Sequence, residues 1–411
     1  MNRALLPLLA GVLVALASAP VLSDEVVAIK AGRIIPIAGD EIRGGVIVIK
    51  DGRIEAIGKD VEIPWDARVI DATDRVVMPG LVEPHSSRGL DRPNERVPNV
   101  PFVSVFDSID PRSSYFEDAV KDGVTTILIT PGNDTLIGGQ TMILKPSGST
   151  VEEMAVKSDV GLKISLRPTG GRSRMSHIGE LRKVLRDMKT ELAETKKQQA
   201  EKKEEDRETV RDLIGDKKRA LADLLEGRFP AFVYCQTASD VIRAVALAKE
   251  FGIRIIPVLG SDGYKAAQVL AKAKLPAIVD PRLIHWERDQ ETGEELPHAN
   301  PTVLRDAGIE FALQSTTSTL GTRFLWFQAA KAVRHGLTRE EALRAITLAP
   351  AQIIGIADRV GSLEKGKDAN LLILTGDPLD IRTWVDTVMI EGEVVYERSK
   401  DKTLEKLETV R

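Results

Sequence analysis

Short apolar strands alternate with helical segments through the middle of this chain, which limits the folds that it can adopt. Between about residues 79 and 359, runs rich in Val and Ile recur and are separated by segments with helical patterning. This alternation is typical of parallel β-sheets whose strands are connected by helices. After a first strand formed by "VVMPGLVE", the expected strands cover residues 124–130, 160–166, 231–236, 253–258, 276–280 and 309–314.

Helix-end signals support the same interpretation. Thr237 and Asp240 stand three residues apart, which is the spacing of a capping box, and the segment closes on Gly252. Thr338 and Glu341 repeat that spacing. The number of strand–helix units predicts an α/β fold with a (β/α)8 TIM-like barrel over residues 79–359. A doubly wound open sheet is the alternative, although no Gly-x-Gly-x-x-Gly motif follows the first strand.

Strand patterns of a different kind occupy both ends of the chain. Two Val- and Ile-rich runs flank Asp51-Gly52, a dipeptide typical of tight hairpin turns, and a similar pair near the C-terminus is broken at Glu391-Gly392. Because the two ends share a pattern that the middle lacks, we expect one small β-sandwich domain built from residues 24–78 and 360–398.

A highly charged segment interrupts the barrel pattern at residues 176–227. Apolar residues recur at helical spacing on both sides of the polar stretch "ETKKQQAEKKEEDRE". The pattern predicts two amphipathic helical arms joined by a solvated stretch. The arms could dock a partner, but a surface insertion that packs its apolar stripes on the barrel is the simpler interpretation.

The N-terminus indicates an exported protein. Residues 1–23 contain Arg3, a short apolar run and small residues, which together are typical of a cleaved signal peptide. A retained membrane anchor is the alternative.

The formal net charge of −4 gives no reason to expect nucleic acid or a membrane as a partner. The single cysteine, Cys235, cannot form an internal disulfide.

Several motifs resemble the amidohydrolase superfamily of metal-dependent hydrolases, and in particular its imidazolonepropionase-like branch. They are "VVMPGLVEPHSS", the "DGRIEAIG" hairpin, the "PGNDTLIGGQ" stretch and the tail "ITLAPAQIIGIADRVGSLEKGKDANLLILTGDPLD". The resemblance implies a metal-binding barrel with a small β-sandwich. It also implies a binuclear centre whose ligands stand at the carboxyl ends of strands, with an aspartate on the last strand as proton acceptor.

Matched against that pattern, only His85 keeps a ligand type. Ser87 replaces the second histidine of the first-strand pair, and Leu259 and Thr316 stand where a histidine and the aspartate are expected. Arg167 lies near the position of a bridging glutamate, for which Lys163 could substitute. Tyr234, Cys235 and Gln236 occupy a strand end that supplies a histidine in similar proteins. The candidate ligand-pocket residues are therefore Ser87, Lys163, Arg167, Tyr234, Gln236 and Thr316.

Other residues offer a weaker metal site. Glu83, Asp134, Asp262 and Asp280 lie near strand ends and could bind Mg²⁺ or Ca²⁺ through carboxylate oxygen, but they do not make a tight nitrogen-ligand zinc site. A nucleophilic role for Cys235 would need a neighbouring base, which the sequence does not indicate.

These observations lead to a leading hypothesis: a superfamily member that has lost its binuclear metal centre, holds no cofactor and binds a small molecule or partner at the barrel mouth. The alternative is an active hydrolase of amide or cyclic amide bonds, with zinc or another divalent metal in a mononuclear site at His85. A structural protein that assembles through its charged insertion is a third hypothesis. Because similar proteins often pair, a homodimer is compatible with all three.

Export can be tested directly. The apolar run after Arg3 should direct the chain out of the cytoplasm to the periplasm or the medium, and the mature protein should begin near Asp24. N-terminal sequencing of the exported protein checks this expectation. A soluble cytoplasmic protein that retains Met1 would contradict it.

Overall fold

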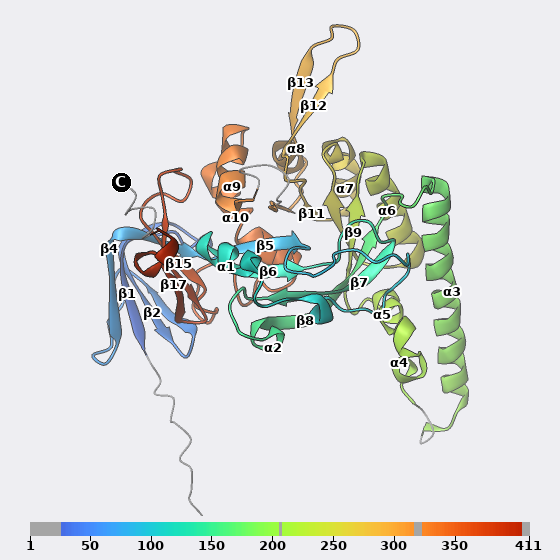
Figure 1. Cartoon of the computed structure of the whole chain (residues 1–411), viewed down its shortest axis with the longest axis horizontal. Coiled ribbons are helices and arrows are strands. Elements are labelled where there is room, and N and C mark those ends of the chain that lie inside the picture. Colours follow the sequence, from blue (N-terminus) through green and yellow to red (C-terminus); the bar gives the residue numbers. More distant parts are fainter. Residues whose placement is uncertain (1–25, 205–207, 316–322, 405–411) are drawn as a thin grey trace, which may run out of the picture.

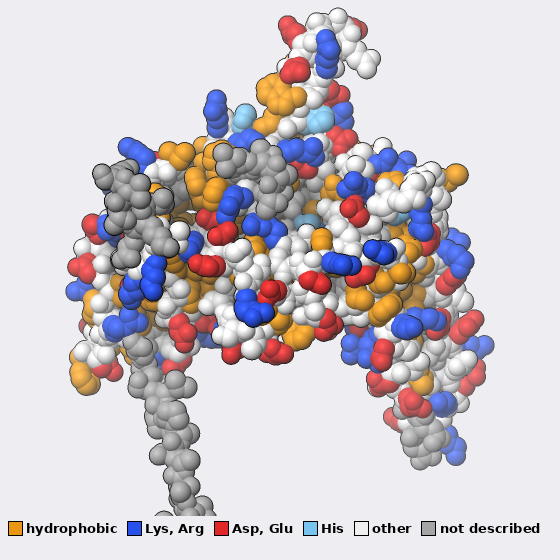
Figure 2. Space-filling model, in the orientation of Figure 1, with side chains coloured by type: hydrophobic (Ala, Val, Ile, Leu, Met, Phe, Trp, Pro, Cys, Tyr) orange, Lys and Arg blue, Asp and Glu red, His pale blue; other side chains and the backbone are white. Residues whose placement is uncertain are grey.

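The computed structural model describes residues 26–204, 208–315 and 323–404, and the predicted signal peptide lies outside them. Two sheets organise the chain, one at the left and one at the centre of Figure 1. A long helix lies at the far right and a two-stranded ribbon projects at the top (Figure 1). On the face in Figure 2, acidic and basic side chains are interspersed rather than gathered into patches of one sign.

The first sheet combines strands from both ends of the chain. It has seven strands in the order β17-β16-β15-β4-β1-β2-β3. The four N-terminal strands adjoin the three C-terminal strands where β4 pairs antiparallel with β15. The bounds are β1 Val27–Ile34, β2 Ile42–Lys50, β3 Arg53–Gly58, β4 Arg68–Pro79, β15 Leu371–Leu374, β16 Val385–Ile390 and β17 Glu393–Glu397.

Both hairpin turns predicted in this sheet are present. Asp51 and Gly52 have positive φ angles of 51° and 74°, and Glu391 and Gly392 have positive φ angles of 50° and 81°. Positive φ at both central residues defines the turn whose twist matches that of antiparallel strands. The two turns lie against each other, since a Cβ on Gly392 would meet the Gly52 Cα at 3.0 Å. The pairs β2–β3 and β16–β17 follow from these turns.

The second sheet has eight strands in the order β14-β11-β10-β9-β8-β7-β6-β5. All adjacent pairs are parallel except those that involve β7, which runs antiparallel to β6 and β8. The bounds are β5 Leu81–Ser86, β6 Val124–Ile129, β7 Ile137–Leu144, β8 Ala155–Ser165, β9 Ala231–Cys235, β10 Ile255–Leu259, β11 Ala277–Ile278 and β14 Phe311–Ala312.

The expected (β/α)8 barrel is therefore confirmed only as a mixed α/β fold. The short connection between β6 and β7 cannot hold a crossover helix, so the two strands must pair antiparallel. The edge strands β5 and β14 do not pair with each other in the described chain. Instead, the carbonyls of Ala345 and Ile346 accept hydrogen bonds from Leu313 N (2.9 Å) and Val82 N (3.0 Å), respectively.

The eight-stranded sheet nevertheless curls until its edges approach. Seven inter-strand spacings of a flat sheet would separate β5 from β14 by roughly 34 Å. In the folded chain, His85 on β5 contacts Gln314, two residues beyond β14, at 3.0 Å. This curvature brings polar residues from distant strands into one interior.

Helices surround this sheet and fill the connections. The predicted capping boxes are present: Thr237 N donates to Asp240 at 3.1 Å and Thr338 N donates to Glu341 at 2.8 Å. The bounds are α1 Ser114–Lys121, α2 Val151–Met154, α3 Arg174–Glu201, α4 Val210–Leu213, α5 Asp216–Leu225, α6 Ala238–Phe251, α7 Ala267–Ala273, α8 Asn300–Asp306, α9 Leu325–Arg334, α10 Arg339–Arg344 and α11 Leu348–Ile353. None of the helices in the described ranges is long and apolar enough to cross a membrane.

The charged insertion forms α3, α4 and α5 (Figure 1). The apolar stripe of α3, which includes Leu181, Leu185, Met188 and Leu192, is buried. This burial agrees with a packed insertion. The polar stretch that begins at Glu194 is mostly exposed, as predicted, and its first part is helical, since α3 runs from Arg174 to Glu201. Lys, Glu, Gln and Ala are strong helix formers, so a polar stretch can extend a helix that is anchored elsewhere.

The joining of the two termini gives a stability prediction. Leu371 on β15 is fully buried beside β4 in the core that also contains Val27 and Ile29. Leu371→Ala should lower the free energy of unfolding by about 2–5 kcal/mol and reduce amide-exchange protection in β1. Val69→Ala, at a side chain that is 47% exposed on β4, should change it by less than about 0.5 kcal/mol. Urea unfolding and hydrogen exchange measure both effects. Full protection of β1 in Leu371→Ala would show that the ends are independent.

Candidate functional site

The candidate site lies in the interior of the eight-stranded sheet, at the carboxyl end of β5. Glu83 and His85 are two residues apart on this strand, so both side chains face the same side. Both are buried, with 1% and 8% exposure. Lys163 on β8 is fully buried, and its Nζ lies 2.6 Å from His85 Nε2. Two strands separate β5 from β8, so this contact crosses the curved interior.

A chain of hydrogen bonds fixes the tautomer of His85. Gln314 donates from Nε2 to the carbonyl of Val279 at 2.9 Å, which leaves its Oε1 to face His85 Nδ1 at 3.0 Å. Because Oε1 can only accept, Nδ1 must carry the proton. Nε2 then holds the lone pair and accepts from Lys163. Protein groups therefore occupy both ring nitrogens.

Burial disfavours the charged forms of both His85 and Lys163. It lowers the pKa of His85 well below its usual value, and the neighbouring Lys163 charge acts in the same direction. Burial also lowers the pKa of the Lys163 amine to about 7. Near neutral pH, His85 is therefore neutral and Lys163 is close to its titration midpoint. The Nζ of Lys163 also lies 5.8 Å from the centre of the Tyr234 ring.

Glu83 is a buried acid whose protonated form is favoured. Its carboxyl oxygens accept from the backbone N–H of Ser315 at 3.0 and 3.3 Å. Burial raises the pKa of Glu83 to about 8, against the opposing effect of these hydrogen bonds. A carboxyl that is protonated at neutral pH does not act there as a general base.

The structure brings only some of the predicted residues together. His85, Lys163 and Tyr234 share the interior. Ser87 follows β5 and is half-buried, whereas its neighbour Ser86 accepts a hydrogen bond from Tyr115. Two further candidates are exposed: Arg167, which pairs with Asp134 at 3.0 Å, and Gln236. Thr316 lies outside the described residues.

Gln314 is the functional residue that sequence reasoning missed. It is 6% exposed and connects His85 to the backbone of the strand beside it. Its signal was a polar residue closing the apolar run "IEFAL", at the carboxyl end of an expected strand. Polar side chains at such positions in α/β sheets commonly face a site. That signal did not identify His85 as its partner.

The carboxylates considered as a weaker metal site are engaged elsewhere. Glu83 accepts from Ser315, Asp134 pairs with Arg167, Asp262 accepts from Ala238 N at 3.1 Å, and Asp280 pairs with Arg282 at 2.8 Å. Within the described ranges, no group of three His, Cys, Asp or Glu residues is arranged to hold a metal ion.

The donor set around His85 does not fit the binuclear metal centre implied by the resemblance. Leu259 is buried at 1% exposure and has no donor atom. Cys235 is fully buried, and burial raises the pKa of its thiol, so the thiolate that binds metal is disfavoured. His85 would have to release Lys163 or Gln314 before a ring nitrogen could bind a metal.

Comparisons with known proteins agree with the architecture. The amidohydrolase family profile matches residues 314–396. The crystal structure of an amidohydrolase from Thermotoga maritima MSB8 superimposes with a TM-score of 0.81 at 30% identity, over 90% of this chain and 100% of that chain. An imidazolonepropionase from Symbiobacterium thermophilum is 26% identical over 85% of this chain and 91% of its own length.

A third relative, the amidohydrolase tasK of Hapsidospora irregularis, is 24% identical over 86% of this chain. The match covers only 41% of tasK, so this chain corresponds to less than half of that protein. The chain belongs to the amidohydrolase superfamily, in its imidazolonepropionase-like branch.

The raised pKa of Glu83 predicts a specific pH dependence of stability. Between about pH 5 and pH 7 the folded protein holds a proton on Glu83 that the unfolded chain has released, so the free energy of unfolding falls as pH rises. Glu83→Gln keeps an acceptor for Ser315 N–H but cannot titrate. It should remove a slope on the order of 1 kcal/mol per pH unit.

Urea unfolding at several pH values measures this slope. Glu55→Gln, at an exposed glutamate on β3, is the control and should retain the wild-type slope. Equal slopes for wild type and Glu83→Gln would mean that Glu83 is ionised in the folded protein.

Proposed function

We propose that this amidohydrolase-superfamily protein has lost the binuclear metal centre and acts as a non-hydrolytic barrel that binds a small molecule at its mouth. The single observation that carries the proposal is the contact between Lys163 Nζ and His85 Nε2. It places a protein amine on the only nitrogen lone pair of the one histidine that matches the family's ligand pattern.

The surrounding groups support this proposal because none replaces the missing chemistry. The resemblance implies that hydrolysis in this superfamily depends on metal-activated water and on an acidic residue that accepts a proton from that water. Here Glu83 is protonated near neutral pH, and the lone pair of His85 is already used by Lys163. The site can donate hydrogen bonds from a lysine, a protonated carboxyl and a phenol, which suits recognition of a polar ligand.

The remaining parts of the proposal follow from the sequence. The mature chain is expected to work outside the cytoplasm, without a resident cofactor and without nucleic acid or membrane partners. A homodimer is compatible with it. The fold itself does not select this function, because function depends on the site and not on the scaffold.

Metal retention and hydrolysis test the proposal together. The purified mature protein is soaked in excess zinc, desalted and analysed for metal. It should retain well under one zinc per chain, because a single imidazole already engaged by Lys163 cannot supply the several ligands that a tight site needs. Acyl-amino acids, dipeptides and cyclic amides should not be hydrolysed above the buffer rate.

Two histidine variants sharpen the result. His85→Gln should change neither metal retention nor hydrolysis, and neither should His335→Gln, a control at a half-buried histidine at the end of α9. The proposal fails if the wild type keeps about one or two zinc ions and His85→Gln, but not His335→Gln, loses both the metal and a measurable hydrolysis. That outcome would establish the alternative, an active hydrolase of carbon–nitrogen bonds with a mononuclear site at His85.

A further inference from the structure

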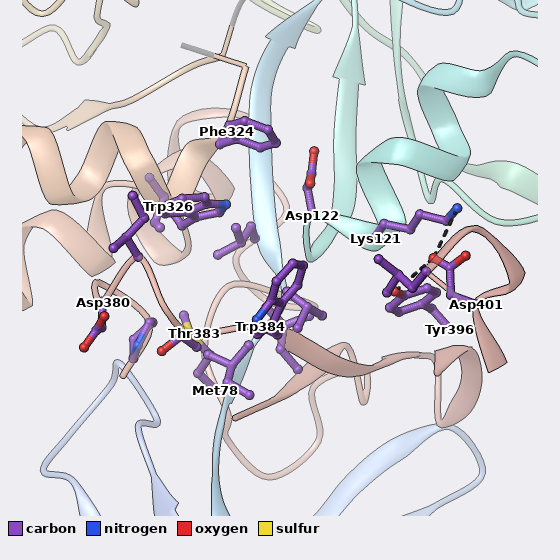
Figure 3. Close-up of a pocket in the computed structure, with 18 residues that line it drawn as sticks. Met78, Lys121, Asp122, Phe324, Trp326, Asp380, Thr383, Trp384, Tyr396 and Asp401 are labelled. Atoms are coloured by element: carbon purple, nitrogen blue, oxygen red, sulfur yellow. Dashed lines mark hydrogen bonds and ion pairs between the residues drawn. The ribbon is translucent and has the colours of Figure 1, made fainter. Parts of the chain in front are cut away.

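We propose that a cavity between the two sheets is a second binding site, which takes an organic cation with an apolar body and pairs it with Asp122. The cavity has a volume of about 340 Å³. Figure 3 shows it between β5, α9, α1 and the C-terminal strands. It is independent of the function proposed for the His85 site.

The position of the cavity separates it from the candidate site around His85. Its floor includes Leu81, the first residue of β5, whereas His85 lies four residues further along the strand. Four residues of extended chain span roughly 13 Å. Asp122, which also lines the cavity, lies just before β6 begins at Val124. The cavity therefore adjoins the amino ends of β5 and β6, opposite the end that carries His85.

Aromatic side chains form much of the cavity wall. Phe324 and Trp326 stand on one side and Trp384 and Tyr396 on the other (Figure 3). The floor is aliphatic and includes Leu372 from β15. Trp384 is 51% exposed, so the cavity opens to solvent at this residue. A cavity of this size with apolar walls and few polar groups has the usual character of a small-molecule site.

Among the described residues, no protein contact explains why the carboxyl group of Asp122 lies at the cavity. It is the C-cap residue of α1, where the helix dipole makes a carboxylate unfavourable. Its side chain has no hydrogen bond or ion pair to another residue in the described part of the chain. Burial raises the pKa of Asp122 to about 7, and the nearby Asp118 charge adds to this effect, while Arg323 and Arg88 oppose it.

The cations near Asp122 have other partners, and Arg88 stacks on the Tyr115 ring at 4.1 Å. Arg323 pairs with Asp118 at 2.9 Å, and Lys121 pairs with Glu117 at 2.8 Å and with Asp401 at 3.4 Å. The other two carboxylates of the cavity are also engaged, since Asp401 binds Lys121 and Asp380 binds Arg382 at 2.6 Å. Asp122 is therefore the carboxylate that a bound cation can pair with.

These features select the class of ligand. A carboxylate that is partly desolvated gains most from a cation that brings its own charge into the cavity. Aromatic faces cover apolar groups and attract cations through their quadrupoles. Arg398 already lies over the Trp384 ring at 4.5 Å and Arg323 over the Phe324 ring at 5.2 Å, so these two rings serve mainly to cover the apolar body of a ligand. An amine or quaternary ammonium on an aromatic or aliphatic body satisfies both parts of the site, whereas an anion would face Asp122 and a neutral ligand would leave it unpaired.

Calorimetric titration with matched probes tests the proposal at pH 8, where Asp122 is mostly ionised. Phenethylamine should bind, and 2-phenylethanol, which has the same body but no charge, should bind about tenfold more weakly or worse. Phenylpropionate should not bind. Asp122→Asn should reduce the affinity for phenethylamine by about tenfold and leave that for 2-phenylethanol unchanged.

Control variants separate the carboxylate from the cavity as a whole. Asp380→Asn changes a cavity carboxylate that is already paired with Arg382, so phenethylamine should bind it like the wild type. Trp384→Ala removes a wall and should weaken both probes. Asp122→Asn should unfold at no lower temperature than the wild type at pH 8, because it removes an unpaired carboxylate. The proposal is overturned if phenethylamine does not bind, if 2-phenylethanol binds equally well, or if Asp122→Asn has the same affinity as Asp380→Asn.

Discussion

The contact between Lys163 and His85 is the interaction on which the rest of the candidate site depends. It joins β8 to β5 across the interior, and with Gln314 beyond β14 it connects strands that a flat sheet would hold far apart. Each of these polar groups is buried, so each needs its partner, because an unpaired buried polar group costs about 1–3 kcal/mol. The contact therefore contributes to the fold and at the same time occupies the nitrogen that a metal would use.

If the metal centre has been lost, as we propose, this double role explains how the scaffold keeps its buried polar groups paired. In a metal centre, each buried ligand is paired with the ion. Loss of the ion leaves these buried polar groups without partners. In this protein a lysine and an amide contact the two ring nitrogens of His85, while Leu259 adds an apolar side chain at a strand where the resemblance implies a ligand.

Much of the architecture could be predicted because its signals are local. The turns at Gly52 and Gly392 and the capping box at Thr237 each follow from a few adjacent residues. The strand β7 was missed because it begins with the glycine-rich sequence "IGGQ", which is typical of a loop. The ribbon of β12 (Ile284–Arg288) and β13 (Glu295–Ala299) was missed because its sequence is polar. The serine at position 87, where the resemblance implies a histidine, could be seen in the sequence. The contact of Gln314 with His85 could not, because it depends on curvature that brings together residues over 200 positions apart.

The protonation and bonding state of the His85 ring shows whether its two nitrogens are engaged by protein groups or are free to bind a metal. Nitrogen NMR of the protein labelled with ¹⁵N-histidine, with His85 assigned from the spectrum of His85→Gln, reports each ring nitrogen separately. The account predicts a neutral ring at pH 7 with the proton on Nδ1, an unprotonated Nε2, and no change when zinc is added. A resonance of either nitrogen that shifts to a metal-bound position on addition of stoichiometric zinc would contradict it.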